Sequence, residues 1–94
     1  MIPVVAVIKA KPGKEKALEA TLKSLLAPTR KEAGCITYEL FTDKADPKAF
    51  VFIEAWKSDK DLQAHLASAH IAVAMARKDE LIASVEIRPL IPAA

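Results

Sequence analysis

The central stretch of this chain reads CITYELFTDKADPKAFVFIEAWK and covers residues 35–57. Its two ends, Cys35 to Thr42 and Phe50 to Lys57, are rich in β-branched and aromatic residues and are typical of strands. Between them, Asp43 to Lys48 forms a turn-rich connection. The pattern predicts an antiparallel hairpin with a loop of about five residues.

The turn does not determine how the two strands of this hairpin pair, and two registers one residue apart remain open. One register makes a wholly apolar face and leaves Glu54 and Trp56 on the opposite face; the apolar residues are Ile36, Tyr38, Leu40, Val51, Ile53 and Ala55. The other register places Tyr38 beside Glu54 and Trp56. The choice decides whether Glu54 faces the helices or the surface where two copies of the chain would meet.

Regular patterns precede the hairpin. Ile2 to Ala10 is a short apolar run that predicts a strand with two apolar faces. From Lys14 the apolar residues recur at helical spacing, which predicts an amphipathic helix that reaches Glu32 or Ala33 and ends at Gly34. Pro28 is expected to kink this helix because its ring displaces one backbone hydrogen bond.

Helical and extended patterns also follow the hairpin. Ser58 is expected to cap a short helix, with Asp61 as its capping-box partner. Ser68 is expected to cap a second helical piece that continues through Ala76 or beyond. Ile82 to Ile91 predicts a last strand.

The resulting order of elements is strand, helix, strand, strand, helix, strand. Two right-handed crossovers on one four-stranded antiparallel sheet place both helices on the same face, so we predict an α+β fold of the ferredoxin-like β-α-β-β-α-β kind. The opposite face of the sheet stays bare although the strands are apolar on both sides, and 52 % of all residues are hydrophobic. A second copy packed sheet to sheet would cover that face, so we also predict a homodimer.

Charge and cysteine content exclude several classes of protein. The formal net charge is +2 and the basic residues are dispersed among acidic ones, which argues against a nucleic-acid partner. The single cysteine, Cys35, cannot form an internal disulfide and fits a reducing compartment. The N-terminus lacks the layout of a signal peptide, and no apolar run is long enough for a membrane span. These features predict a cytoplasmic protein without a membrane partner.

Glu54 and Trp56 lie two residues apart on the second strand of the hairpin, on the same face as Phe50 and Phe52. A carboxylate among aromatic rings must find a hydrogen-bond donor or take up a proton, because burying it unpaired is costly. Two interpretations remain open. Either Glu54 bonds a backbone or helix group and Trp56 is core packing, or the two line a pocket for a flat ligand.

His65 and His70 flank the break expected at Ser68. On one continuous helix, five positions would separate them by about 140°, and no carboxylate stands at ligand spacing, so no shared metal ion is expected. If the helix changes direction at Ser68, the two imidazoles can still approach a common cavity. Histidine suits proton abstraction near neutral pH. The alternative is a capping or surface role for each.

Four segments, taken in order, resemble the antibiotic biosynthesis monooxygenase family: KPGK (11–14), EAGCITY (32–38), FVFIEAW (50–56) and HLASAH (65–70). The likeness spans nearly the whole chain and implies one domain, residues 1–94, in a dimeric, α/β barrel-like ferredoxin fold. The sequence is most similar to small quinol-monooxygenase-like members. Relatives that degrade haem use an asparagine on the first strand, and this chain has no asparagine.

The resemblance implies oxidation of a quinol or related polyphenol by dioxygen, with neither cofactor nor metal ion. On this interpretation His65 and His70 are candidate bases or donors to the substrate anion, and Glu54 orients one of them. Trp56 and Phe52 would bound the substrate ring, with Tyr38 also at the substrate.

Two other functions remain open. One is an isomerase acting on a small polar substrate, for which a pocket lined by Arg30, Arg77 or Arg88 would speak. The other is a non-catalytic ligand-binding or stress-related dimer, with both histidines in solvent and Glu54 satisfied by the backbone.

Overall fold

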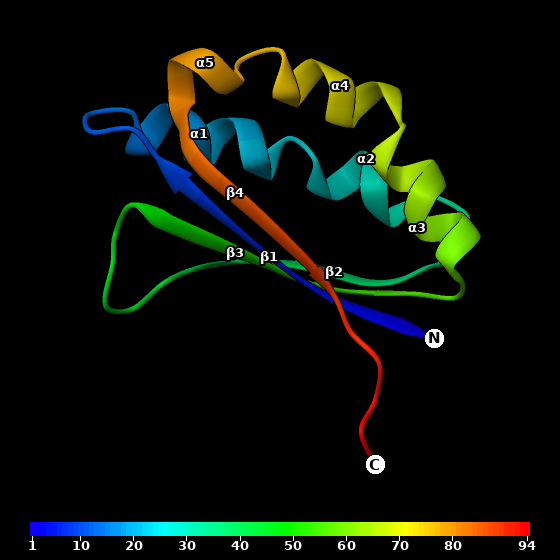
Figure 1. Ribbon diagram of the computed structural model, residues 1–94. Helices are drawn as coiled ribbons and strands as arrows, with labels where there is room; N and C mark the ends of the chain where they lie inside the picture. The colour runs from blue at the N-terminus through cyan, green and yellow to red at the C-terminus, as the bar shows by residue number, and fades with distance from the viewer.

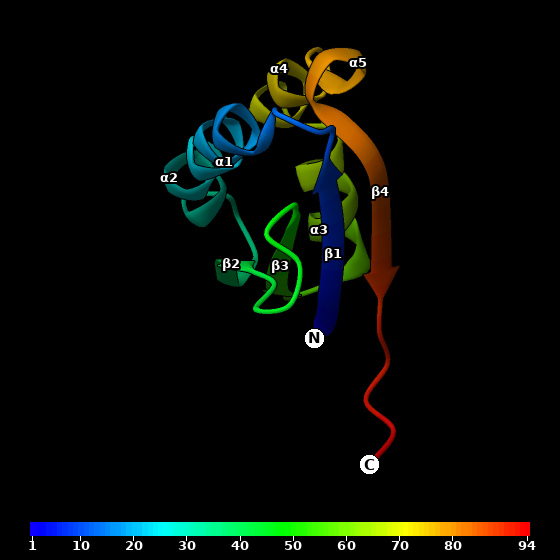
Figure 2. The ribbon, with the colours of Figure 1, turned by 90° about the vertical axis from the view of Figure 1, so that its left-hand side faces the viewer.

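Four strands form one antiparallel sheet, and five helices lie on one face of it (Figures 1 and 2). The computed structural model describes residues 1–94, and the strand order across the sheet is β2-β3-β1-β4. This is the predicted ferredoxin-like α+β fold. The first predicted helix is divided in two, and the second helical segment is broken at Ser68 as predicted and again before Lys78. The elements are β1 (Ile2–Ala10), α1 (Glu15–Lys23), α2 (Leu26–Arg30), β2 (Cys35–Thr42), β3 (Ala49–Trp56), α3 (Asp59–Leu66), α4 (Ala69–Met75), α5 (Lys78–Leu81) and β4 (Ile82–Pro89).

The hairpin adopts the second of the two open registers. Tyr38 pairs with Glu54 and Leu40 pairs with Phe52, so the even-numbered residues of β3 face the helices. The pairing shifts between Cys35 and Thr37, where β2 carries an irregularity. The connecting loop covers residues 43–48. β3 begins at Ala49, one residue earlier than predicted.

The first helical segment is interrupted one turn before Pro28. α1 ends at Lys23 and α2 begins at Leu26, whereas the sequence predicted one kinked helix from Lys14. Pro28 has no N–H to donate to the carbonyl of Ser24, and its ring would clash with that carbonyl in a regular helix. Since this is the position where the helix is broken, the proline explains the break.

Gly34 ends the segment as predicted, with a φ of +81° that favours glycine. A Cβ on this residue would lie 2.2 Å from Asp61 Oδ2, so the chain can pass close to α3 only because position 34 has no side chain.

The second helical segment is broken at Ser68. The Ser58 hydroxyl accepts a hydrogen bond from Asp61 N at 3.2 Å, as predicted for the N-terminus of α3. Ser68 stands before α4, but its hydroxyl donates back to the carbonyl of His65 at 2.6 Å, so the side-chain cap predicted there is wrong. The last strand ends at Pro89, not at Ile91. None of the helices is both long and apolar enough to cross a membrane.

The core lies between the helices and the inner face of the sheet. β1 and β3 contribute alternating buried residues, and α1 contributes its apolar face. The largest fully buried side chains include Trp56, Tyr38, Phe50, Phe52, Leu18 and Leu22. The outer face of the sheet is not covered by any helix (Figure 2). On it, Phe41 and Ile53 remain about half exposed.

Candidate active site

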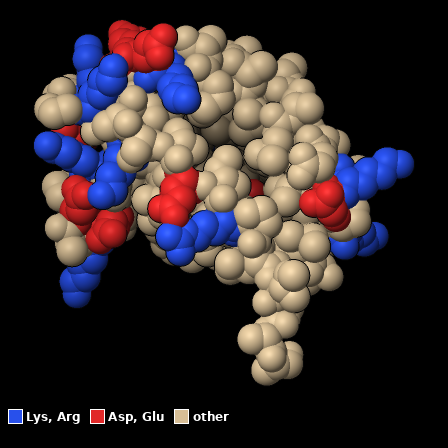
Figure 3. Space-filling view, in the orientation of Figure 1, with Lys and Arg blue, Asp and Glu red and all other residues tan.

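A cavity of about 220 Å³ opens between the inner face of the sheet and helices α3 and α4. Its walls are hydrophobic apart from a few polar groups, chiefly Glu54 and His65. In the space-filling view, charged side chains gather mostly toward the two ends of the molecule, and the hollow between α4 and β4 is surrounded largely by uncharged atoms (Figure 3). A concave, mostly apolar cavity with few polar groups is the usual form of a small-molecule site.

Aromatic rings form one wall of the cavity. Tyr38 stacks on Phe52 with ring centroids 4.6 Å apart, and His65 meets Tyr38 edge-on at 5.3 Å. Burial and the neighbouring Glu54 carboxylate raise the pKa of Tyr38 above its ordinary value. The Tyr38 hydroxyl therefore stays protonated and can act as a hydrogen-bond donor.

Glu54 is a buried carboxylate with one strong partner. Its Oε1 accepts a hydrogen bond from Trp56 Nε1 at 2.9 Å. Burial raises the pKa of Glu54, while the Trp56 N–H and the nearby His65 act in the opposite direction. Trp56 has no exposed surface and also packs on the His65 ring, with centroids 4.6 Å apart.

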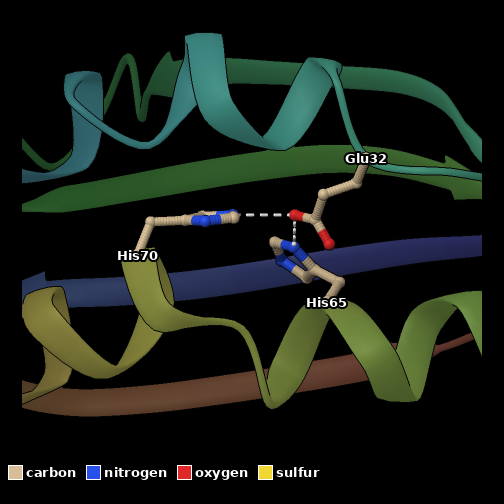
Figure 4. Close-up of side chains that lie close together, drawn as sticks. All are labelled: Glu32, His65 and His70. Carbon is tan, nitrogen blue, oxygen red and sulfur yellow. Dashed lines mark hydrogen bonds and ion pairs between the residues drawn. The ribbon is translucent and has the colours of Figure 1, made fainter.

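Both histidines converge on one oxygen of Glu32. Glu32 Oε2 lies 2.8 Å from His65 Nδ1 and 2.8 Å from His70 Nε2 (Figure 4). The His65 side chain is 2 % exposed, that of Glu32 is 16 % exposed and that of His70 is 24 % exposed. The cluster thus leads from the buried interior to the surface.

The break between α3 and α4 makes this convergence possible. His65 lies in the last turn of α3 and His70 in the first turn of α4, so the separation of about 140° on a continuous helix does not apply. Glu32 belongs to the connection between α2 and β2, 33 residues before His65. No carboxylate stands at ligand spacing along the sequence, but the tertiary structure brings Glu32 to both histidines.

Glu32 determines which nitrogen of His65 carries the proton. An ionised carboxylate only accepts hydrogen bonds, so His65 Nδ1 must donate. In the neutral imidazole this leaves the lone pair on Nε2, on the side of the ring turned away from Glu32. Because His65 lines the cavity, Glu32 holds it in the tautomer of a general base.

The structure separates the predicted site residues into two groups. Tyr38, Phe52, Glu54 and His65 line the cavity. Trp56 packs behind Glu54 and His65 and is not part of the cavity wall, so its predicted contact with a substrate ring is wrong.

His70 lies outside the cavity, in a groove of about 360 Å³ that it shares with Arg77. The implied role of Glu54 in orienting a histidine is also wrong, because Glu32 makes both hydrogen bonds. Sequence reasoning missed Glu32. The available signal was its place at the start of the EAGCITY segment, two residues before the glycine that brings the chain close to α3.

The fold and the site define a class: a ferredoxin-like α+β domain with a carboxylate-oriented histidine at the wall of an apolar cavity. The model of the family described as "Antibiotic biosynthesis monooxygenase" matches residues 1–77. The chain belongs to this family.

Individual relatives agree with this assignment. "Putative monooxygenase YcnE" of Bacillus subtilis (strain 168) is 32 % identical over 84 residues, which cover 89 % of this chain and 88 % of that protein. The chain spans 56 % of the length of another relative, "Uncharacterized protein sll1783" of Synechocystis sp., at 29 % identity over 82 residues, 87 % of this chain. Among solved structures, PA3566 from Pseudomonas aeruginosa matches with a TM-score of 0.93 and 36 % identity, covering 99 % of this chain and 94 % of that chain.

Proposed function

We propose that this protein is a cofactor-independent monooxygenase that oxidises a quinol or a related polyphenolic small molecule with dioxygen. The observation that carries the proposal is the position of His65, which Glu32 orients and which stands in the wall of an apolar cavity. The family and the names of its relatives support a monooxygenase role. The quinol as substrate class is our own assignment.

The cavity suits a single aromatic ring. Its volume of about 220 Å³ exceeds the roughly 150 Å³ that is enough to take benzene in an apolar protein cavity. The stacked pair of Tyr38 and Phe52 offers a flat wall against which a substrate ring can pack. Apolar walls also keep water away from a reactive anion.

A quinol needs little help from the protein to react with dioxygen. His65 Nε2 takes the proton from one phenolic hydroxyl, and the resulting phenolate is electron-rich enough to reduce dioxygen. A bond then forms between a ring carbon beside the phenolate oxygen and one oxygen atom, and the resulting peroxide takes the proton from His65 to become a hydroperoxide. His65 next accepts the proton of that ring carbon while the O–O bond breaks, and it passes this proton to the departing hydroxide, which leaves as water. One quinol and one dioxygen thus give one hydroxyquinone and one water.

Tyr38 and Glu54 can hold the second hydroxyl of a quinol. Tyr38 keeps its proton and can donate to a phenolate oxygen, while Glu54 can accept from a phenolic hydroxyl. Both residues line the same cavity as His65. The three groups would select a substrate that carries two oxygen substituents.

Two observations favour oxygenation over the other functions considered. No lysine or arginine lines the cavity, so an anionic substrate of an isomerase would find no cationic partner there. His65 is buried, and Glu54 is bonded by the Trp56 side chain, unlike the arrangement expected of a non-catalytic dimer.

Oxygen uptake by the metal-free protein with a panel of hydroquinones tests the proposed function. After subtraction of autoxidation, we expect uptake of one dioxygen for each quinol with no release of hydrogen peroxide, because the second oxygen atom leaves as water. Release of one peroxide for each quinol would show a two-electron oxidase instead. Uptake no greater than the protein-free blank across the panel would refute the proposal.

We further propose that the protein acts as a homodimer, joined through the outer face of the sheet. Phe41 and Ile53 are each about half exposed, although large apolar side chains on one sheet face are normally covered. A second copy would cover them with the same face. The single free Cys35 is consistent with a reducing, cytoplasmic location for this dimer.

Replacing Ile53 with aspartate is expected to convert the dimer to monomers, because a charge would then be buried at the centre of the interface. The matched control is Val73→Asp on α4, which is 71 % exposed and lies on the helical side of the molecule. Sedimentation or light scattering measures the mass of each. A wild-type protein that is monomeric at micromolar concentration, or a dimer that survives Ile53→Asp, would contradict the proposed interface.

A further inference from the structure

Glu32, His65 and His70 present three potential metal ligands to one point. We propose that these side chains form a binding site for a divalent transition-metal ion of the Zn²⁺ class. The three donor atoms, Glu32 Oε2, His65 Nδ1 and His70 Nε2, all lie within 4.8 Å of one another. They come from two helices, α3 and α4, and from the connection between α2 and β2, so the tertiary structure assembles the cluster.

The donor set selects the class of ion. Two imidazole nitrogens and one carboxylate oxygen are the ligands of many zinc sites that keep a fourth position open for water. Ca²⁺ and Mg²⁺ prefer oxygen ligands alone, so they fit poorly. Zn²⁺, Co²⁺, Ni²⁺ and Cu²⁺ all suit imidazole, with affinities that generally rise toward Cu²⁺.

The geometry requires only a small rearrangement. Each nitrogen now lies 2.8 Å from the carboxylate oxygen, at hydrogen-bond distance. In a tetrahedral zinc site the ligand atoms stand about 3.4 Å apart. The carboxylate oxygen must therefore move slightly away from the two nitrogens, while the imidazole rings keep their orientation. Glu32 can make this movement, since it lies between α2 and β2 and its side chain is partly exposed.

The charge of the cluster and its access to solvent also suit a divalent metal ion. When both imidazoles are neutral, as metal ligands must be, the ionised carboxylate gives the cluster one negative charge. His70 lines the groove of about 360 Å³ that also contains Ser24 and Arg77, and this groove gives an ion a route from solvent. The cationic Arg77 in that groove is paired with Glu80 at 3.0 Å, which reduces its repulsion of an incoming ion.

Metal binding would change the tautomer of His65. A metal ion on Nδ1 places the remaining proton on Nε2, where the lone pair of the base would otherwise stand. The ion would therefore inhibit the oxygenation, and this consequence alone rests on the proposed function. The binding itself does not depend on any reaction.

Co²⁺ is the probe for the test, because four-coordinate Co²⁺ absorbs visible light far more strongly than the hydrated ion. Titration of metal-free protein is expected to give the four-coordinate spectrum and to saturate at one Co²⁺ per chain. Zn²⁺ should then displace the Co²⁺ and abolish the spectrum. A cobalt spectrum that stays that of the hydrated ion, or binding that never saturates, would overturn the proposal.

Two variants localise the site without replacing the buried His65. Glu32→Gln and His70→Gln keep side chains of similar size and hydrogen-bonding capacity but remove one good ligand each, so each should weaken binding at least about tenfold. Glu39→Gln, an exposed carboxylate on β2, is the matched control and should bind like the wild type. Circular dichroism confirms folding. Unchanged affinity in both cluster variants would refute the assignment.

Inhibition gives a second, separate measurement. If the protein consumes oxygen with a quinol, stoichiometric Zn²⁺ should suppress that uptake, and a chelator should restore it. A protein that binds Co²⁺ as described but oxidises no quinol would retain the metal site and lose the proposed function. The reverse result would retain the function and lose the site.

Discussion

Replacing His65 with glutamine is expected to lower kcat for the proposed quinol oxygenation by about 10²–10⁴-fold, the usual contribution of a positioned general base. Glutamine can still donate a hydrogen bond to Glu32 and fills much of the same space, but it cannot take a proton from a phenol. The core around Trp56 and Tyr38 should therefore stay packed while the rate falls. Oxygen uptake at saturating quinol measures the change, and circular dichroism verifies the fold.

His70→Gln is the matched comparison for this variant. His70 bonds the same carboxylate oxygen but does not line the cavity, so we expect its loss to lower kcat far less than the loss of His65. This ordering distinguishes the two histidines, both of which the sequence left as candidates. A larger loss in His70→Gln, or full activity in His65→Gln, would show that the base is assigned to the wrong side chain.

Replacing Trp56 with alanine reduces the free energy of unfolding by about 3–5 kcal/mol, because it empties a large, fully buried site. It also removes the only N–H bonded to the buried Glu54 carboxylate. Since small domains are stable by about 5–15 kcal/mol, this loss would leave little stability. Urea unfolding at one fixed protein concentration measures it. A loss below 1 kcal/mol, on the order of a surface substitution, would contradict the packing.

Trp56→Phe separates the hydrogen bond from the packing. It keeps most of the ring but leaves the Glu54 oxygen without its donor, at a cost of about 1–3 kcal/mol. Burial already raises the pKa of Glu54, so the folded state holds a proton that the unfolded state loses above the ordinary value of 4.5. Stability from this group is therefore present below that value and declines as pH rises toward the raised pKa.

Losing the Trp56 donor raises the pKa of Glu54 further, because the N–H stabilises the charged carboxylate. The cost of Trp56→Phe should therefore be greater at pH 7.5 than at pH 4. Glu54→Gln provides the control, since a neutral side chain at position 54 should remove this difference. An equal cost at both pH values in the Glu54 background would show that the carboxylate is not the partner that matters.

Much of the fold was predictable because its signals are local. Alternation along Ile2–Ala10 and along the hairpin depends on residues that are neighbours in the chain, and β1 and β2 have the predicted bounds. Gly34 and the Ser58–Asp61 cap are also local, and both were predicted correctly. The break in the first helix was harder to locate, because Pro28 acts on a carbonyl one turn earlier. The break at Ser68 was predicted correctly, but Ser68 bonds backwards to His65 instead of capping α4.

The candidate site was predictable only in part. Tyr38, Phe52, Glu54 and His65 were identified as site residues and share the cavity wall. Their neighbour Glu32 was not identified, because a hydrogen bond between residues 33 positions apart produces no periodic pattern in the sequence. Trp56 was given the wrong role for a related reason. The position of Trp56 on β3 indicates which face of the sheet its side chain occupies. It does not indicate whether a ligand or a histidine packs against that side chain.

The sequence by itself determined the family, the order of elements and which residues alternate on each strand, because hydrophobic period and turn chemistry act over a few neighbouring residues. Only the tertiary structure decided the hairpin register and the meeting of Glu32, His65 and His70. The register depends on which side chains the helices cover. Pairing Tyr38 with Glu54 also places Phe52 and Trp56 in the core beneath the helices. The cluster forms because α3 and α4 are separated at Ser68 and Gly34 lets the chain from α2 pass beside α3, and both depend on packing between segments far apart in the chain.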